Sequence, residues 1–139
     1  MKLNFKNSNQ LRVRYSETDQ MGYCYYGNYA QYFEVGRVET LRKIGISYKH
    51  LEEKGIMLPV IDFYVKYKIP AKYDDKLTIQ TKIIEIKGAK IKFEYVITNE
   101  SNQTIAISAT TLAFISKKTM RPTIPPKDFI ELISQYKIN

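Results

Sequence analysis

The first regular alternation of apolar and polar residues predicts a β-strand that leads into a loop. Apolar Leu11, Val13 and Tyr15 alternate with polar Arg12, Arg14 and Ser16. This two-residue period is typical of a strand with one buried face. Acidic, amide and glycine residues then break the alternation over residues 17–29. We therefore expect a strand followed by a loop that opens onto a helix.

The next apolar pattern predicts a long helix from about Gly27 to Ile44. Its apolar side consists of Tyr29, Phe33, Gly36, Thr40 and Ile44, which recur at spacings of three and four. Glycine in a helix interior costs roughly 1 kcal/mol relative to alanine, so Gly36 indicates a close approach between the helix and a sheet. Gly45 is expected to end the helix.

The rest of the chain is read as a short helix, four strands and a final helix. The short helix covers about 47–54 and ends at Gly55. The strands are expected over 61–69, 77–86, 91–97 and 104–115, with Pro70 ending the first and a bulge near Ile83 in the second. Residues 125–136 have apolar positions at helical spacing. The polar residues 99–102 form a turn.

This order of elements predicts an α+β fold. About five antiparallel strands would form one twisted sheet around the 27–44 helix, the geometry called the hotdog fold. The 139 residues are close to the usual size of one domain, so we expect a single domain over 1–139.

Composition and charge narrow the class of protein. The chain is 44% hydrophobic and 26% charged, as in ordinary globular domains, and has neither a membrane-spanning stretch nor the apolar core of a signal peptide. Cys24 is the only cysteine, so a cytoplasmic protein without internal disulfides is expected. The net charge of +8 would favour an anionic partner, but no run of five basic residues indicates nucleic-acid binding.

Residues 12–45 resemble the 4-hydroxybenzoyl-CoA thioesterase-like branch of the hotdog-fold acyl-CoA thioesterases. The shared features are a strand ending in Tyr15, the acidic loop Asp19 to Gly22, the step Gly27-Asn28-Tyr29 into a helix, and Tyr32, Phe33 and Glu34 within that helix. The run IPAKYDDKLTI at 69–79 resembles the family's connection between the second and third strands. The resemblance implies hydrolysis of acyl-CoA to a carboxylic acid and free CoA. An acyl-acyl carrier protein substrate, or acyl-thioester binding without catalysis, remains an alternative.

Asp19 is the candidate catalytic residue. A carboxylate in a glycine-bearing loop before a helix lies near N–H groups that have no partner within the helix. Thioester hydrolysis needs a carboxylate and donors for the developing oxyanion, which Asp19 and the backbone N–H of Tyr26 or Gly27 could supply. The resemblance assigns the catalytic role to Asp19 and the oxyanion donor to Tyr26, where many members carry histidine. It leaves open whether Asp19 is nucleophile or general base.

Other residues are candidates for substrate contacts. Met21, Tyr25, Tyr29 and Met57 could line the acyl pocket, and Lys72, Lys90 and Lys92 could meet the CoA phosphates. Glu34 is the alternative catalytic residue, and His50, the only histidine, is expected at the surface. No cluster has metal-ligand spacing, so neither a metal nor a cofactor beyond the substrate's own CoA is expected.

A homo-oligomer is also expected. Val35 and Val38 interrupt the polar outer face of the long helix, and an open sheet leaves edges exposed. The family resemblance implies a homodimer or homotetramer with sites at the subunit interface.

Overall fold

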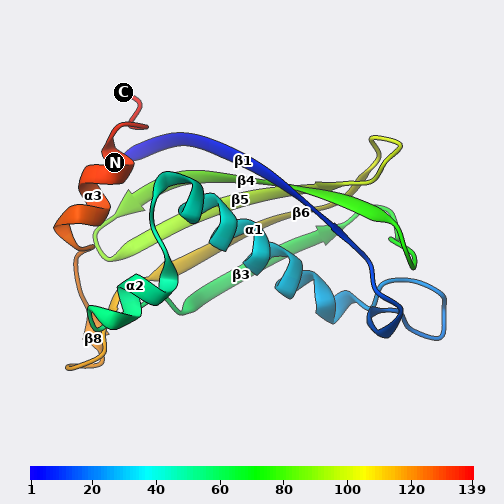
Figure 1. The fold of residues 1–139 in the computed structure, drawn as a ribbon, viewed down its shortest axis with the longest axis horizontal. Coiled ribbons are helices and arrows are strands. Elements are labelled where there is room, and N and C mark those ends of the chain that lie inside the picture. Colours follow the sequence, from blue (N-terminus) through cyan, green and yellow to red (C-terminus); the bar gives the residue numbers. More distant parts are fainter.

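One antiparallel sheet curls around one long helix (Figure 1). The structure is a computed structural model that describes residues 1–139. The sheet has the order β1-β4-β5-β6-β3 and consists of β1 (Lys2–Arg12), β3 (Val60–Tyr67), β4 (Lys76–Lys87), β5 (Lys90–Thr98) and β6 (Thr104–Ala113). Helix α1 (Tyr29–Ile44) packs against β1, β4 and β5. The expected α+β hotdog architecture is confirmed.

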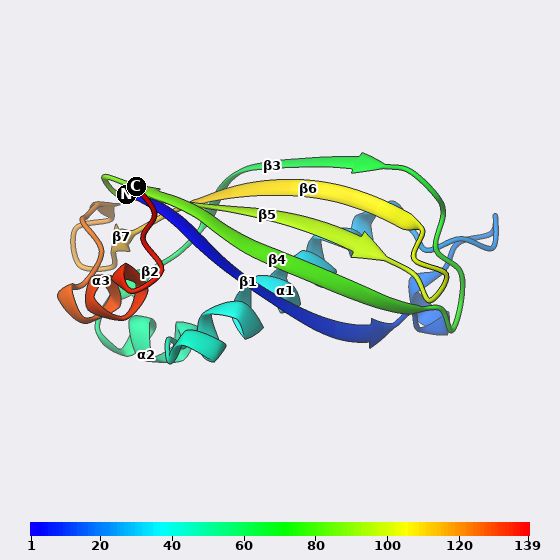
Figure 2. The same cartoon turned by 90° about the horizontal axis from the view of Figure 1, so that it is seen from above.

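The smaller elements gather at the two ends of α1 (Figure 2). Two 3-10 helices, η1 (Tyr15–Glu17) and η2 (Tyr26–Asn28), lie where α1 begins. The opposite end carries α2 (Tyr48–Glu53), α3 (Lys127–Ser134) and a small sheet of β2 (Ile56–Met57), β7 (Ile115–Ser116) and β8 (Arg121–Pro122). The small sheet was not predicted. No helix has both the length and the apolar character needed to cross a membrane.

The first strand lies earlier in the chain than the sequence pattern predicted. β1 ends at Arg12, which pairs with Lys76 at the start of β4; beyond it, Val13 hydrogen-bonds only to Asp74 and Asp75 in the turn that precedes β4. Tyr15, expected in the strand, instead begins η1 and is 78% exposed. The inward alternation is real, however, because Leu3 and Val13 at its two ends are both buried.

The other strands follow the prediction with one revision. The register of β4 against β5 shifts between Ile83 and Glu85, which confirms the bulge. β3 ends at Tyr67 and does not continue to Ile69. Its expected inward face is poorly covered in the single chain, since Phe63 remains 43% exposed. The reason is that β3 is an edge strand, whereas α1 packs against β1, β4 and β5.

Helix α1 buries the face that its apolar spacing predicted. Phe33 has no exposed surface, and its ring centroid lies 4.9 Å from that of Tyr95 on β5. Complete burial of such a side chain contributes about 1.5–3 kcal/mol. Gly45 ends the helix at a φ of 101°, and the N–H groups of Gly45 and Ile46 donate to carbonyls of the last turn. This pattern is a Schellman motif, for which glycine is the preferred residue.

Gly36 marks the closest approach between α1 and the sheet. A Cβ atom at this position would lie 2.5 Å from Oγ1 of Thr81 and 2.9 Å from Cγ2 of Ile79, both on β4. Neither distance is compatible with normal packing. The absence of a side chain at Gly36 therefore determines how deeply the helix sits.

We expect Gly36→Ala to destabilise the protein by about 1 kcal/mol and by no more than about 2 kcal/mol, because overpacking costs about 1–3 kcal/mol and the gain in helix propensity offsets about 1 kcal/mol of it. Denaturant unfolding measures the effect. Lys43→Ala, on the exposed side of α1, should change stability by less than about 0.5 kcal/mol. Adding Thr81→Ala to Gly36→Ala should restore part of the loss; a double variant less stable than the sum of both changes would contradict this explanation.

Candidate active site

The loop between η1 and η2 holds Asp19 in a fixed turn. Oδ1 of Asp19 accepts hydrogen bonds from the backbone N–H of Met21 at 2.9 Å and of Tyr23 at 3.4 Å. The Asp19 carbonyl accepts from the N–H of Gly22 at 3.0 Å, and Gly22 adopts a φ of 82°. This positive φ suits glycine. The turn fixes one carboxylate oxygen of Asp19 and leaves Oδ2 without a protein donor.

The start of η2 presents two N–H groups without protein acceptors. The N–H of Asn28 donates to the carbonyl of Tyr25 at 2.9 Å, whereas those of Tyr26 and Gly27 donate to no group of the chain. A Cβ at Gly27 would lie only 2.7 Å from the ring of Tyr25, so a larger residue would displace that ring. Unpaired N–H groups at the beginning of a helical segment suit a negatively charged oxygen.

Asp19 and Tyr26 line one cavity of about 250 Å³. Its other lining residues are Met21, Tyr23, Cys24, Tyr29, Tyr67, Lys68, Ile69 and Pro70. The hydroxyl of Tyr67 donates to the carbonyl of Tyr26 at 3.4 Å and thereby links the end of β3 to η2. Burial raises the pKa of Tyr29 to about 12, so its phenol is neutral at physiological pH. The cavity is therefore mainly apolar and aromatic, with one carboxylate at its wall.

Asp19 also borders a second, more open hollow. Six further residues line it: Tyr15, Ser16, Thr18, Gln20, Gly22 and Tyr73. Ser16, Thr18 and Gln20 make this hollow more polar than the first cavity. Asp19 thus lies at the junction of an apolar cavity and a polar surface hollow.

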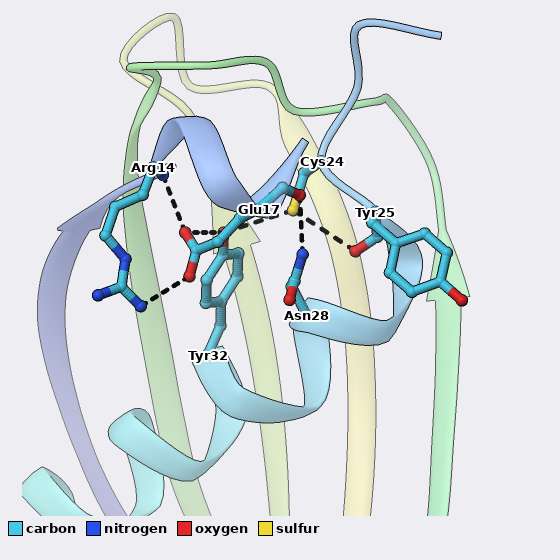
Figure 3. A network of polar contacts seen from close by, with 6 residues as sticks. All are labelled: Arg14, Glu17, Cys24, Tyr25, Asn28 and Tyr32. Atoms are coloured by element: carbon cyan, nitrogen blue, oxygen red, sulfur yellow. Dashed lines mark hydrogen bonds and ion pairs between the residues drawn. The ribbon is translucent and has the colours of Figure 1, made fainter. Parts of the chain in front are cut away.

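The buried carboxylate of Glu17 lies next to this loop and is held by Arg14 and Tyr32 (Figure 3). Glu17 is 5% exposed; its Oε1 accepts from the N–H of Arg14 and from the hydroxyl of Tyr32, and its Oε2 accepts from Nη2 of Arg14, each at 2.9 Å. Burial alone would raise the pKa of Glu17, but the hydrogen bonds from Arg14 and Tyr32 outweigh it and hold the pKa below its usual range. Burial raises the pKa of the neighbouring Cys24 thiol, which therefore stays neutral.

Most of the predicted site residues lie together. Asp19, Tyr26, Met21 and Tyr29 line the cavity, while Tyr25 and Gly27 belong to the turn beside it. Lys72 forms an isolated β-bridge with Tyr23, next to the loop.

Met57, Lys90 and Lys92 lie elsewhere. Met57 belongs to β2, and both lysines are in the first residues of β5, so within one chain they are at the end of the fold opposite Asp19 (Figure 2). Glu34 lines a different cavity, between α1 and β3. His50 is exposed on α2, with its Nε2 4.0 Å from Asp128.

Six of the ten residues that line the cavity, and the buried Glu17 next to the loop, were not predicted from the sequence. Tyr23, Cys24, Tyr67, Lys68, Ile69 and Pro70 were not named as site residues. Ile69 and Pro70 do carry a signal, because they begin the family-like run at 69–79. Glu17 carries a weaker one, its spacing of three residues from Arg14. No three His, Cys, Asp or Glu side chains come together as metal ligands.

Comparison with known proteins gives the family. Residues 13–133 match the thioesterase-like superfamily. The putative acyl-CoA thioesterase YneP of Bacillus subtilis (strain 168) is 33% identical over 129 residues, which cover 92% of this chain and 93% of that protein. A DHNA-CoA thioesterase structure from Staphylococcus aureus matches with a TM-score of 0.90 at 33% identity, over 94% of this chain and 89% of that one.

A structure of a 4-hydroxybenzoyl CoA thioesterase shares the fold, with a TM-score of 0.83 at 22% identity over 92% of this chain and 98% of that chain. The match to the thioesterase-like superfamily and the 33% identity with YneP confirm the family resemblance drawn from residues 12–45. Because the family match spans most of the sequence and the relatives align over nearly their whole length, the chain belongs to the thioesterase-like superfamily.

Proposed function

We propose that the chain hydrolyses acyl-CoA thioesters to a carboxylic acid and free CoA, with Asp19 as the catalytic carboxylate. Thioester hydrolysis as the class of reaction follows from the family and from relatives aligned over nearly their full length. The observation that carries the site assignment is the cavity shared by Asp19 and Tyr26, at the N-terminal end of η2 where two N–H groups lack partners.

The two hollows beside Asp19 suggest how the substrate lies. The acyl group would occupy the apolar cavity, in contact with Met21 and Tyr29, and the CoA arm would leave through the polar hollow. The thioester carbonyl would then lie at Asp19. Asp19 attacks the carbonyl carbon itself or removes a proton from an attacking water, and the N–H groups of Tyr26 and Gly27 stabilise the oxyanion. The C–S bond breaks, and the CoA thiolate leaves. Where Asp19 acts as general base, the proton that it took from the water passes to the thiolate. Where Asp19 attacks directly, the acyl group stays on Asp19 as a mixed anhydride; a water molecule then hydrolyses this anhydride to the carboxylic acid and the free Asp19 carboxylate, and the thiolate takes up the proton that is released.

We expect Asp19→Asn to lower kcat by about 10²–10⁴, the usual contribution of general acid–base chemistry, because it removes the charge and keeps the shape. Tyr26→Phe should change kcat by less than about tenfold, since the backbone N–H remains; loss of an oxyanion donor would cost about 10² or more. Release of free thiol from a panel of acyl-CoA and acyl-acyl carrier protein substrates measures both.

Each of the two variants can give a result that contradicts the proposed mechanism. An active Asp19→Asn enzyme would contradict the proposed mechanism and move attention to Glu34. An inactive Tyr26→Phe enzyme would mean that the hydroxyl, not the N–H, takes part. A wild-type chain that binds acyl-CoA without releasing thiol would instead be a binding module.

Of the three candidate lysines, only Lys72 lies near enough to Asp19 in the same chain to meet the CoA phosphates. It lies beside Tyr23 at the loop, and its backbone N–H donates to Oδ2 of Asp75 at 2.8 Å. Its side chain is exposed and forms no ion pair in the chain. Lys90, Lys92 and Met57 could join this site only from a second subunit.

We expect Lys72→Ala to raise KM for acyl-CoA by up to about fivefold, the effect of losing an exposed ion pair worth up to about 1 kcal/mol. KM for a short acyl thioester without the nucleotide should stay unchanged, because it has no phosphates to meet. Steady-state kinetics with both substrates tests the assignment. Equal increases for the two substrates would reject Lys72 as a phosphate contact.

We also propose a homo-oligomer that pairs two chains through β3. The other edge strand, β1, carries polar or charged side chains on its outer face, which discourages pairing. β3 instead exposes Ile61, Phe63 and Tyr64 by 48%, 43% and 57%. The buried guanidinium of Arg37, which faces the cavity beside β3, donates only to the hydroxyls of Tyr48 and Tyr95 and has no carboxylate partner in its own chain.

The β3 sequence is self-complementary in charge. If two copies pair antiparallel about Tyr64, Asp62 of each chain lies opposite Lys66 of the partner subunit, and opposite charges directly across two strands are favourable. Sedimentation should show a species of at least twice the 16.3 kDa chain mass at micromolar concentration.

We expect Asp62→Lys or Lys66→Asp to weaken the assembly, because each creates two like-charge pairs per dimer, and the double exchange Asp62→Lys with Lys66→Asp to restore it. Sedimentation velocity over a dilution series measures this. A wild-type protein that sediments only at the single-chain mass would refute the assembly. Single exchanges without effect would refute the register alone.

A further inference from the structure

Glu17 is a buried titratable residue that the proposed chemistry does not use. It is 5% exposed and is not among the side chains that line the Asp19 cavity. Its carboxylate nevertheless joins separate parts of the fold: Arg14 just after β1, and Tyr32 on the first full turn of α1. An ionised carboxylate away from water is retained only where such donors compensate it.

The backbone carbonyl of Glu17 connects this network to the candidate oxyanion hole (Figure 3). It accepts from the N–H of Tyr25 at 2.8 Å and from Nδ2 of Asn28 at 2.7 Å. Tyr25 and Asn28 are the residues before and at the end of the turn that presents the unpaired N–H groups of Tyr26 and Gly27. One carbonyl oxygen therefore holds both ends of that turn.

The side chain of Glu17 in turn fixes where this carbonyl lies. Three donated hydrogen bonds hold the carboxylate, and the Tyr32 hydroxyl that supplies one of them also contacts the Cys24 thiol at 3.4 Å. The residue is thus anchored at its side chain and acts on η2 through its backbone.

We propose that Glu17 is a positioning residue for thioester hydrolysis, which together with Asn28 aims the N–H groups of Tyr26 and Gly27 at the developing oxyanion. The proposal rests on the proposed function. Glu17 touches neither the substrate nor the reacting atoms. Loss of Glu17 would therefore slow the chemical step, in which the N–H groups must meet the oxyanion. Misplacement of catalytic groups by about 1 Å can cost up to about 10²-fold in rate.

Two variants test the two halves of the network. Glu17→Gln keeps the shape but removes the charge and places an NH₂ group against a donor, either Arg14 or Tyr32. Asn28→Ala removes the side-chain bond to the Glu17 carbonyl and leaves all three donors of the Glu17 carboxylate in place. Each should lower kcat by about tenfold or more and leave KM within about twofold of wild type. Asn28 is half-buried, so its variant remains informative even if Glu17→Gln does not fold.

Thr40→Val is the matched control. It removes a buried hydrogen bond of α1, from Oγ1 of Thr40 to the carbonyl of Gly36 at 2.7 Å, at a distance from η2. It should lower Tm while kcat stays unchanged. A merely structural role for Glu17 would make the variants behave alike, with activity following stability.

Amide NMR gives a readout that needs no catalysis. The N–H resonances of Tyr26 and Gly27 should shift in Glu17→Gln and Asn28→Ala and stay in place in Thr40→Val. Unmoved amides, or an unchanged kcat in the folded variants, would overturn the proposal. A wild-type protein without thioesterase activity would refute the proposed function, and the amide shifts would then still decide whether Glu17 positions η2.

Discussion

The contact between α1 and the concave face of the sheet is the constraint on which the other features depend. The chain has one long helix to cover the sheet, and Gly36 lets it approach β4 more closely than any side chain would permit. Once α1 is fixed along β1 and β4, its first turn must lie at the end of the sheet where β1 finishes. The loop with Asp19 and η2 are therefore held against the packed helix and sheet, although η2 has only three residues.

The packing around α1 is apolar along most of the helix and polar at its N-terminal end. Along the helix, Phe33 and Leu41 pack among aliphatic and aromatic side chains, but at its beginning the buried contacts are between Glu17, Tyr32 and Cys24. Apolar contacts tolerate small shifts, whereas a hydrogen-bonded network is satisfied in few geometries. A network of this kind suits a turn whose backbone N–H groups must point in one direction.

What could be predicted from the sequence was local in origin. The helix end at Gly45 and the bulge after Ile83 follow from conformational freedom and from a change in hydrophobic phase, both readable within a few residues. The end of β1 could not be predicted, because it depends on where a strand more than sixty residues away begins. The small sheet is formed by three two-residue strands, too short for any period to show.

The residues of the candidate site also fall into those that were predictable from nearby sequence and those that were not. Asp19 and Tyr26 belong to one short motif and were predicted together. Tyr67 is distant from them in the sequence and lines the cavity only because the fold brings the end of β3 beside η2. In the sequence, little distinguishes Glu17 from an ordinary exposed carboxylate in a loop. Its role becomes visible only in the structure, where it is 5% exposed and accepts a hydrogen bond from the hydroxyl of Tyr32.

Both ends of the chain lie at the pole of the fold remote from Asp19 (Figure 2). They lie side by side, since the N–H of Asn4 donates to the carbonyl of Tyr136 and that of Ile138 to the carbonyl of Lys2. A fused partner, a purification tag or an anchor to a solid support attached at either end would therefore lie away from the mouth of the cavity in the same chain. The short gap between the ends also makes the fold suited to circular permutation, with a brief linker joining them.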